Sequence, residues 1–241
     1  MSNTLQIGTA HIPYEVVKTR GRRMRISFRP NAPILVIHTP DGRLSQQAEA
    51  FIHQQQSWIL KHYSRQQSLH TEQQQFLRDV EVGELSLMGK KARIQFIPAP
   101  SARIQRQDLN IELHLPPKHI EDKTARRHYI KEGLRFVAKQ YLIPRTHQLA
   151  QKTDSLINTV RIKDHKSKWG SCSAKSNINL NWHLILLDEP LIDYVIIHEL
   201  MHLREMNHSA RFWNWVAAYY PGYKEAEAQI KTREWLIGVL D

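Results

Sequence analysis

Hydrophobic and polar residues alternate along short segments in the first half of the chain. Alternation with period two is typical of strands that bury one face, and the prolines and glycines between the segments predict turns. We expect strands in the segments 12–17, 24–28, 34–38, 82–89, 92–99 and 102–116.

Other segments carry apolar residues at the spacing of a helix. Residues 45–67 predict one amphipathic helix with Ser45 as its N-cap. A stripe that begins near residue 121 predicts a second helix, which we expect Pro144 to kink or end. Three further helices are predicted at 190–204, 210–220 and 223–236, and two short strands at 158–162 and 177–185.

The order of these elements predicts an α+β protein. We expect a β-rich N-terminal part with one long helix, and a helical C-terminal part in which a β-hairpin precedes the helix at 190–204. The best candidate hinge is the segment Pro116–Lys118. We therefore expect two domains, 1–118 and 119–241.

Composition narrows the class of protein. The formal net charge is +11 and the sequence pI is about 9.8, which favours polyanions or acidic molecules as partners. The single cysteine, Cys172, excludes a disulfide within the chain and fits a reducing compartment. The first twenty residues lack the apolar core of a signal peptide, and no apolar run is long enough to cross a bilayer. We expect a cytoplasmic protein that does not enter a membrane, and its oligomeric state stays open.

The segment HELMHLREMNH at 198–208 carries the clearest chemistry. On a helix, His198 and His202 lie one turn and about 40° apart, so both imidazoles can bind one ion. Glu199 lies about 100° further round, where it can reach a water held by that ion and act as a general base. This H-E-x-x-H pattern is typical of zinc hydrolases. The surrounding helix is apolar on nearly every side, which predicts a buried helix where unpaired polar groups would be costly.

A catalytic zinc needs a third protein ligand. We favour His208, which lies beyond the expected helix end, because Asn207 tolerates the left-handed backbone that turns a chain back. Three carboxylates compete with it as ligands: Glu205, Glu225 and Glu227.

The segment KSKWGSCS, at 166–173, is the candidate substrate-binding turn before this helix. A strand edge beside the zinc would let an extended peptide add to the sheet. A hairpin whose tryptophan only fills the core is the alternative, and a Cys172 nucleophile is disfavoured because small buried cysteines are usually inert. The candidate substrate-binding residues are Lys168, Trp169, Ser171 and Cys172.

These segments resemble a known family. The stretches IHELMHLREMNHSARFW at 197–213 and RIKDHKSKWGSCSAKSNINLNWHLILL at 161–187 are similar to the YgjP-like metallopeptidase domain, a zincin group similar to the SprT-like and WLM proteases. The resemblance extends over about residues 15–235 and implies a zincin-like C-terminal domain. It also implies that His198, His202 and His208 are the ligands of one Zn²⁺ and that Glu199 is the base.

The histidine spacing also matches the metzincin clan. However, Glu205 stands where those proteins carry glycine, and no methionine follows His208. We therefore do not expect a metzincin fold.

The leading hypothesis is a zinc metallopeptidase that uses a zinc-activated water, although another divalent metal is compatible with the ligands. One alternative is a metal-dependent nucleotide pyrophosphatase or phosphohydrolase, with Arg161, Lys166 and Lys168 on the phosphates. The YgjP-like resemblance leaves it open, because nucleotide pyrophosphatase activity has been associated with that family. The sequence does not rank the candidates for stabilising the transition state: His183, Arg204, Tyr219, Tyr220 and Tyr223.

A third hypothesis is a non-catalytic zinc module that binds nucleic acid. It depends on a cluster of cations that would suit phosphate contacts, but basic side chains on an edge strand also deter unwanted pairing. The cluster comprises Lys18, Arg20, Arg22, Arg23, Arg25 and Arg29.

Overall fold

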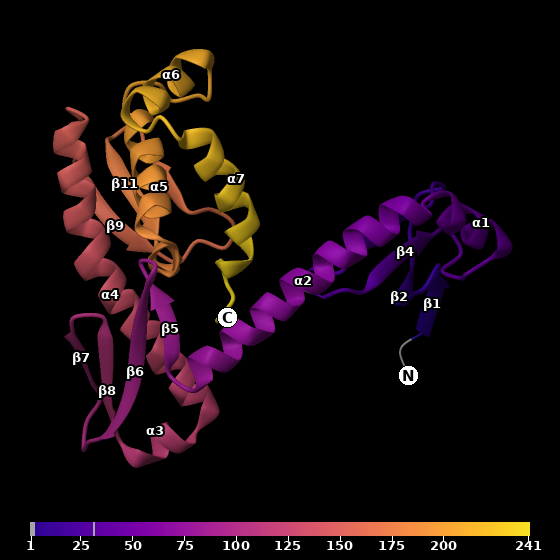
Figure 1. The fold of residues 1–241 in the computed structure, drawn as a ribbon, viewed down its shortest axis with the longest axis horizontal. Coiled ribbons are helices and arrows are strands. Elements are labelled where there is room, and N and C mark those ends of the chain that lie inside the picture. Colours follow the sequence, from indigo (N-terminus) through magenta and orange to yellow (C-terminus); the bar gives the residue numbers. More distant parts are fainter. Residues whose placement is uncertain (1–2, 31) are drawn as a thin grey trace. The chain divides into compact units, whose positions relative to one another are not determined.

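A computed structural model describes residues 3–30 and 32–241 of the chain. The protein is α+β, as predicted, with its sheets mainly in the N-terminal half and helices toward the C-terminus (Figure 1). The chain divides into two compact units, one up to Gln75 and one from Phe76 to Asp241. These units divide the chain at a different place from the expected boundary at residue 118, because the strands between residues 84 and 115 pack in the second unit.

The first unit contains one four-stranded sheet and the helices that follow it. The strand order is β1-β2-β4-β3, with β2 and β4 parallel and the other pairs antiparallel. The predicted strands are present, and β1 is an additional edge strand whose two apolar residues give too short an alternation to recognise. The elements are β1 (Asn3–Ile7), β2 (Ala10–Lys18), β3 (Arg25–Phe28), β4 (Leu35–Thr39), α1 (Gln46–Gln54) and the first part of α2 (Gln56–Glu81).

The helix predicted at 45–67 is two helices, α1 and α2, which meet at Gln55. Ser45 is the N-cap, as predicted, and its hydroxyl accepts a hydrogen bond from the backbone N–H of Ala48 at 3.3 Å. Ile52 of α1 and Ile59 of α2 join the apolar face of the sheet in one buried cluster. The apolar stripe was therefore predicted correctly, but it belongs to two helices.

The basic residues of the first unit lie mostly outside strands. Only Arg25 belongs to the edge strand β3, and Lys18 ends the interior strand β2. Arg20, Arg22 and Arg23 lie in the loop between these strands and are exposed. Protection of a strand edge therefore does not explain most of the cluster.

The second unit contains two sheets and the remaining helices. Their strand orders are β5-β6-β8-β7 and β10-β11-β9. The elements are β5 (Glu84–Leu87), β6 (Lys90–Pro98), β7 (Arg103–Gln107), β8 (Asn110–Leu115), α3 (Pro117–Glu121), α4 (Lys123–Lys152), β9 (Thr159–Lys163), β10 (Gly170–Cys172), β11 (Asn177–Asn181), η1 (Trp182–Leu186), α5 (Glu189–Met201), α6 (Ala210–Tyr219), α7 (Tyr223–Arg233) and η2 (Glu234–Leu236).

Helix α4 packs against both sheets of this unit, and Figure 1 shows it running beside β9 at one end and β8 at the other. Gly133 allows the close approach to β8, because a Cβ there would lie 3.0 Å from Ile111 and 3.2 Å from Leu113. The helix does not end at Pro144, contrary to one of the two expectations. One lost backbone hydrogen bond is tolerated because the helix buries apolar residues on both sides of Pro144.

The three-stranded sheet differs in detail from the predicted hairpin. The strand predicted at 158–162 pairs parallel with β11, and the antiparallel hairpin is formed by β10 and β11. The strand predicted at 177–185 ends at Asn181, where the chain enters a 3-10 helix. Short antiparallel pairing over three residues leaves little periodicity in the sequence, so β10 could be read only as a turn.

Helix α5 is buried on nearly every side, as its apolar sequence predicts. It packs against β10, β11, α4, α6 and α7 in the core of the second unit. Among the helices of the described residues, none combines the length and the apolar run needed to cross a bilayer.

Candidate metal centre and active site

The helix that carries the histidines ends earlier than predicted, at Met201, and His202 is its C-cap. His202 keeps right-handed helical dihedral angles, so it still lies one turn beyond His198 on the same side of α5. The ring centroids of His198 and His202 are 5.0 Å apart. The helical pair inferred from the sequence is therefore present.

The turn after α5 brings the third histidine back to this pair. Nε2 of His208 lies 3.0 Å from Nε2 of His198. One ligand atom from each of His198, His202 and His208 lies within 4.8 Å of the others, and this triad is the candidate metal cluster found among the described residues.

The turn does not use the left-handed backbone expected at Asn207, which is absent from the described residues with positive φ. Instead, the side-chain oxygen of Asn207 accepts a hydrogen bond from the backbone N–H of Ser209 at 3.0 Å. Ser209 then caps α6, where its hydroxyl accepts from the N–H of Phe212 at 3.4 Å.

The three carboxylates that compete with His208 as metal ligands do not belong to the triad. Glu205 lies 3.8 Å from the guanidinium of Arg211, and Glu227 forms an ion pair with Lys231 at 2.8 Å. Glu225 is exposed in the first turn of α7 and does not belong to the cluster.

The protonation of His198 and His202 fits a metal site. Nδ1 of His202 lies 3.1 Å from the carbonyl oxygen of Glu205, so it donates its proton there and leaves Nε2 with a free lone pair. Burial, with smaller contributions from His202 and His208, lowers the pKa of His198 to about 3. Burial also lowers the pKa of His202. Three imidazoles that converge in this way are a suitable donor set for Zn²⁺.

Glu199 is 7% exposed and lies against the backbone of the strand β10. A Cβ on Gly170 would come within 2.7 Å of its Cγ and 2.8 Å of its Oε1. Burial raises the pKa of Glu199 to about 7, although the charge of Lys168 and a hydrogen bond from the backbone N–H of Cys172 act in the opposite direction. A carboxyl group with such a pKa can both accept and return a proton near neutral pH.

A cavity of about 450 Å³ contains the triad and Glu199. All four candidate substrate-binding residues line it: Lys168, Trp169, Ser171 and Cys172. Gly170, which belongs to the same predicted turn, lines it as well. Tyr194 also lines it but was not singled out from the sequence, because it resembles any other core residue of α5.

Burial, and secondarily the charge of Glu199, raises the pKa of the Cys172 thiol to about 11. Near neutral pH the thiol therefore stays protonated and is a poor nucleophile. This agrees with the preference for a metal site over a cysteine mechanism.

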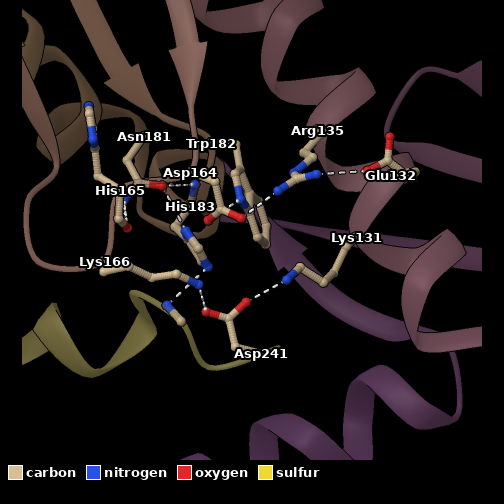
Figure 2. Close-up of polar contacts among 11 residues, drawn as sticks. Lys131, Glu132, Arg135, Asp164, His165, Lys166, Asn181, Trp182, His183 and Asp241 are labelled. Carbon is tan, nitrogen blue, oxygen red and sulfur yellow. Dashed lines mark hydrogen bonds and ion pairs between the residues drawn. The ribbon is translucent and has the colours of Figure 1, made fainter. Parts of the chain in front are cut away.

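The cations proposed for phosphate binding are separated by the fold. Lys168 lines the cavity, whereas Arg161 does not belong to its lining. Lys166 forms an ion pair with Asp241 in a different cluster (Figure 2).

The candidates for stabilising the transition state have structural partners outside this cavity. Arg204 donates to the carbonyl of Thr153 at 2.6 Å and lies over the ring of Trp215. The hydroxyl of Tyr220 donates to the carbonyl of Pro190 at 3.0 Å. The remaining three are likewise absent from the lining: His183, Tyr219 and Tyr223.

The chain is similar to several known proteins. A family model described as YgjP-like, metallopeptidase domain, matches residues 22–233. An uncharacterised protein of Methanocaldococcus jannaschii is 33% identical over 82 residues, which are 32% of this chain and 74% of that protein.

Two crystal structures of metallopeptidase zymogens also match part of the chain. Abylysin of Pyrococcus abyssi is 30% identical, with 38% of this chain and 93% of that chain covered and a TM-score of 0.36. Jannalysin of Methanocaldococcus jannaschii is 28% identical, with 38% of this chain and 95% of that chain covered and a TM-score of 0.35.

Proposed function

Because the chain belongs to the YgjP-like metallopeptidase domain family, a group of metallopeptidase-type hydrolases, we propose that it is a zinc-dependent peptidase with Glu199 as its general base. The observation that carries this proposal is that three converging histidines and a buried glutamate share one cavity.

The proposed ligands of one zinc ion are His198, His202 and His208. When bound, zinc would supply a Lewis acid that polarises a carbonyl and makes water more acidic. The nitrogen-only donor set would also accept other divalent transition metals, so the identity of the metal is part of the proposal.

Glu199 is the proposed proton carrier. Its carboxylate would accept a proton from the attacking water and then return it to the nitrogen of the leaving amine. The pKa of about 7 supports both steps, because neither protonation state is strongly disfavoured near neutral pH. The contact with Gly170 and the hydrogen bond from Cys172 would keep the carboxylate in one position during the transfer.

The proposed substrate is an extended segment of polypeptide. Strand β10 is at the edge of its sheet, and its three residues line the cavity that contains Glu199. A peptide that follows this edge would pass Lys168 and Trp169 and reach the histidines. Pairing with a strand edge selects for extended backbone, so unfolded proteins should be better substrates than folded ones.

Metal analysis followed by hydrolysis assays tests the proposal. We expect about one zinc per chain, cleavage of an unfolded protein, and no release of phosphate or pyrophosphate from a panel of nucleotides. Glu199→Gln should reduce kcat by about 10²-fold or more while the zinc content stays unchanged. Full hydrolytic activity in Glu199→Gln would exclude the proposed base.

Glu225→Gln is the matched control, because it makes the same chemical change at an exposed glutamate outside the cavity. It should retain both zinc and activity. Turnover of nucleotides without cleavage of polypeptide would favour the phosphohydrolase. Salt-dependent binding of nucleic acid without any turnover would favour the binding module.

A further inference from the structure

Three consecutive residues, Asn181, Trp182 and His183, precede α5 in the sequence and are fully buried. Asn181 ends β11, and the other two begin η1. Each side chain forms hydrogen bonds that connect it to the turn at 164–169 or to the segment around Gly238 (Figure 2). None of the three lines the cavity with Glu199.

Asn181 holds the turn through three hydrogen bonds. Its side-chain Nδ2 donates to the carbonyl oxygens of His165 and Lys168, each at 2.9 Å. Its backbone N–H donates to the carbonyl of Trp169 at 2.7 Å. Both protons of the amide are thus used to hold the backbone just before Gly170.

His183 fixes the orientation of that amide. The backbone N–H of Gly238 donates to Nε2 of His183 at 3.1 Å, so this nitrogen is the acceptor and the ring proton is on Nδ1. Nδ1 lies 2.7 Å from the side-chain oxygen of Asn181 and donates to it. The backbone N–H of His183 donates to the same oxygen at 3.3 Å. A flipped amide would point its NH₂ group at both donors, so His183 favours the orientation in which Asn181 holds the turn.

Trp182 secures the other end of the same turn. Its Nε1 donates to the carboxylate of Asp164 at 3.1 Å, and Arg135 of α4 forms an ion pair with that carboxylate. Asn181 and Trp182 are adjacent in the sequence, so neighbouring residues hold Lys168 and Asp164, which lie near the two ends of the turn.

The turn leads directly into the strand that positions Glu199. Gly170 contacts the side chain of Glu199, and the backbone N–H of Cys172 donates to its carboxylate. A shift of the turn would move both contacts, because Trp169 and Gly170 are adjacent residues.

We propose that Asn181 and His183 are positioning residues for Glu199, acting through the turn at 164–169 and the strand β10. This inference rests on the proposed function of Glu199 and extends it to residues that touch neither substrate nor metal. The chain of contacts runs from His183 to Asn181, then to the carbonyls of the turn, and finally through Gly170 to the carboxyl group.

Asn181→Asp tests the role with almost no change of shape. The carboxylate cannot donate to the two carbonyls, so the turn should loosen. We expect kcat to fall by about tenfold or more with KM changed by less than about threefold, because a small displacement of a catalytic group mainly affects the chemical step. Zinc content should not change.

A second readout does not need activity. Cys172 is the only cysteine in the sequence and lies in β10, so its rate of alkylation by iodoacetamide reports on the strand. We expect Asn181→Asp to increase this rate severalfold. If the wild-type protein hydrolyses nothing, the proposed function fails, whereas the alkylation rate still decides whether Asn181 holds the strand.

Asn158→Asp is the control on the same sheet. The side chain of Asn158 donates to Asn177 at 3.1 Å, at the end of β11 remote from Asn181, so this variant should match the wild type in kcat and in alkylation. His183→Phe is a second test that keeps a ring against Trp182 and removes both ring nitrogens. It should change both readouts in the same direction as Asn181→Asp.

Wild-type kcat and wild-type alkylation in folded Asn181→Asp would overturn the inference. A raised KM with unchanged kcat would overturn it as well, because it would assign the turn to substrate binding alone. Should Asn181→Asp fail to fold, the same criteria apply to His183→Phe.

Discussion

His183 and His198 both lie in the second unit, and burial lowers the pKa of each, to about 4 for His183 and about 3 for His198. Their ring nitrogens differ. His183 has a partner on each nitrogen, at 2.7 and 3.1 Å. His198 has a buried Nδ1 without a hydrogen-bond partner among the described residues, and its Nε2 faces the Nε2 of another histidine.

This difference distinguishes a structural histidine from a candidate ligand. A neutral imidazole carries one donor and one acceptor, and the surroundings of His183 satisfy both. In the triad, ring nitrogens converge on one another, an arrangement that a shared cation would stabilise. The hydrogen-bond partners of the ring nitrogens, and not burial, therefore distinguish His183 from the histidines of the triad.

Loss of a triad histidine should give the largest effect. His202→Ala should reduce the zinc content from about one per chain to nearly none and reduce hydrolysis by at least about 10²-fold, because the metal supplies several kcal/mol of transition-state stabilisation. His183→Phe should retain the zinc. Elemental analysis of both variants checks the comparison, and full zinc content in His202→Ala would contradict it.

Gly170→Ala should give the next largest effect. The new Cβ would lie 2.7–2.9 Å from the Cγ, Oε1 and Cδ atoms of Glu199, so the carboxyl group must move. We expect kcat to fall by about 10²-fold and the free energy of unfolding to fall by about 1–3 kcal/mol. Kinetics and denaturant unfolding measure the two effects.

Gly21→Ala is the control for this substitution. The nearest atom to its Cβ would be Oγ1 of Thr19 at 3.8 Å, which is ordinary contact. Its kcat and stability should match those of the wild type, so equal behaviour of the two alanine variants would show that the contact with Glu199 is unimportant.

The titration of His183 should have a moderate effect on stability. Its pKa is about 4 in the folded protein, whereas the ordinary pKa of a histidine in an unfolded chain is 6.5, so between these pH values the unfolded chain binds more protons at this ring. The free energy of unfolding should therefore fall as the pH is lowered from about 6.5 to about 4, by an amount on the order of 3 kcal/mol.

His183→Phe isolates this contribution, since the other titrating groups are common to both proteins. Unfolding of metal-free wild type and variant, measured across the same pH range, should give a shallower slope for the variant. Parallel slopes would mean that His183 is accessible to protons in the folded state.

Substitution of the two lysines that pair with Asp241 should have the smallest effect on stability. Asp241 forms ion pairs with Lys131 and Lys166, whose side chains are 19% and 70% exposed. Water screens the more exposed pair, so Lys166→Gln should leave the unfolding midpoint unchanged within error, whereas Lys131→Gln should lower it. A larger shift for Lys166→Gln would reverse this order.

Local pattern predicted much of the fold and part of the site. The alternating segments and helical stripes indicated most strands and helices, because side-chain periodicity is a property of neighbouring residues. The break at Gln55 and the short strand β10 were not predicted. The break at Gln55 leaves the apolar stripe continuous, and β10 is only three residues long, so neither gives a periodic signal.

The sequence by itself determined the pairing of His198 with His202 and the adjacent Glu199, because one turn of helix fixes their relative positions. Only the tertiary structure decided that His208 returns to this pair, that Gly170 lies against Glu199, and that Asn181 and His183 hold the turn before it. These contacts join residues from different elements. Their geometry is set by how α5, β10 and η1 pack in one core, which no local spacing specifies.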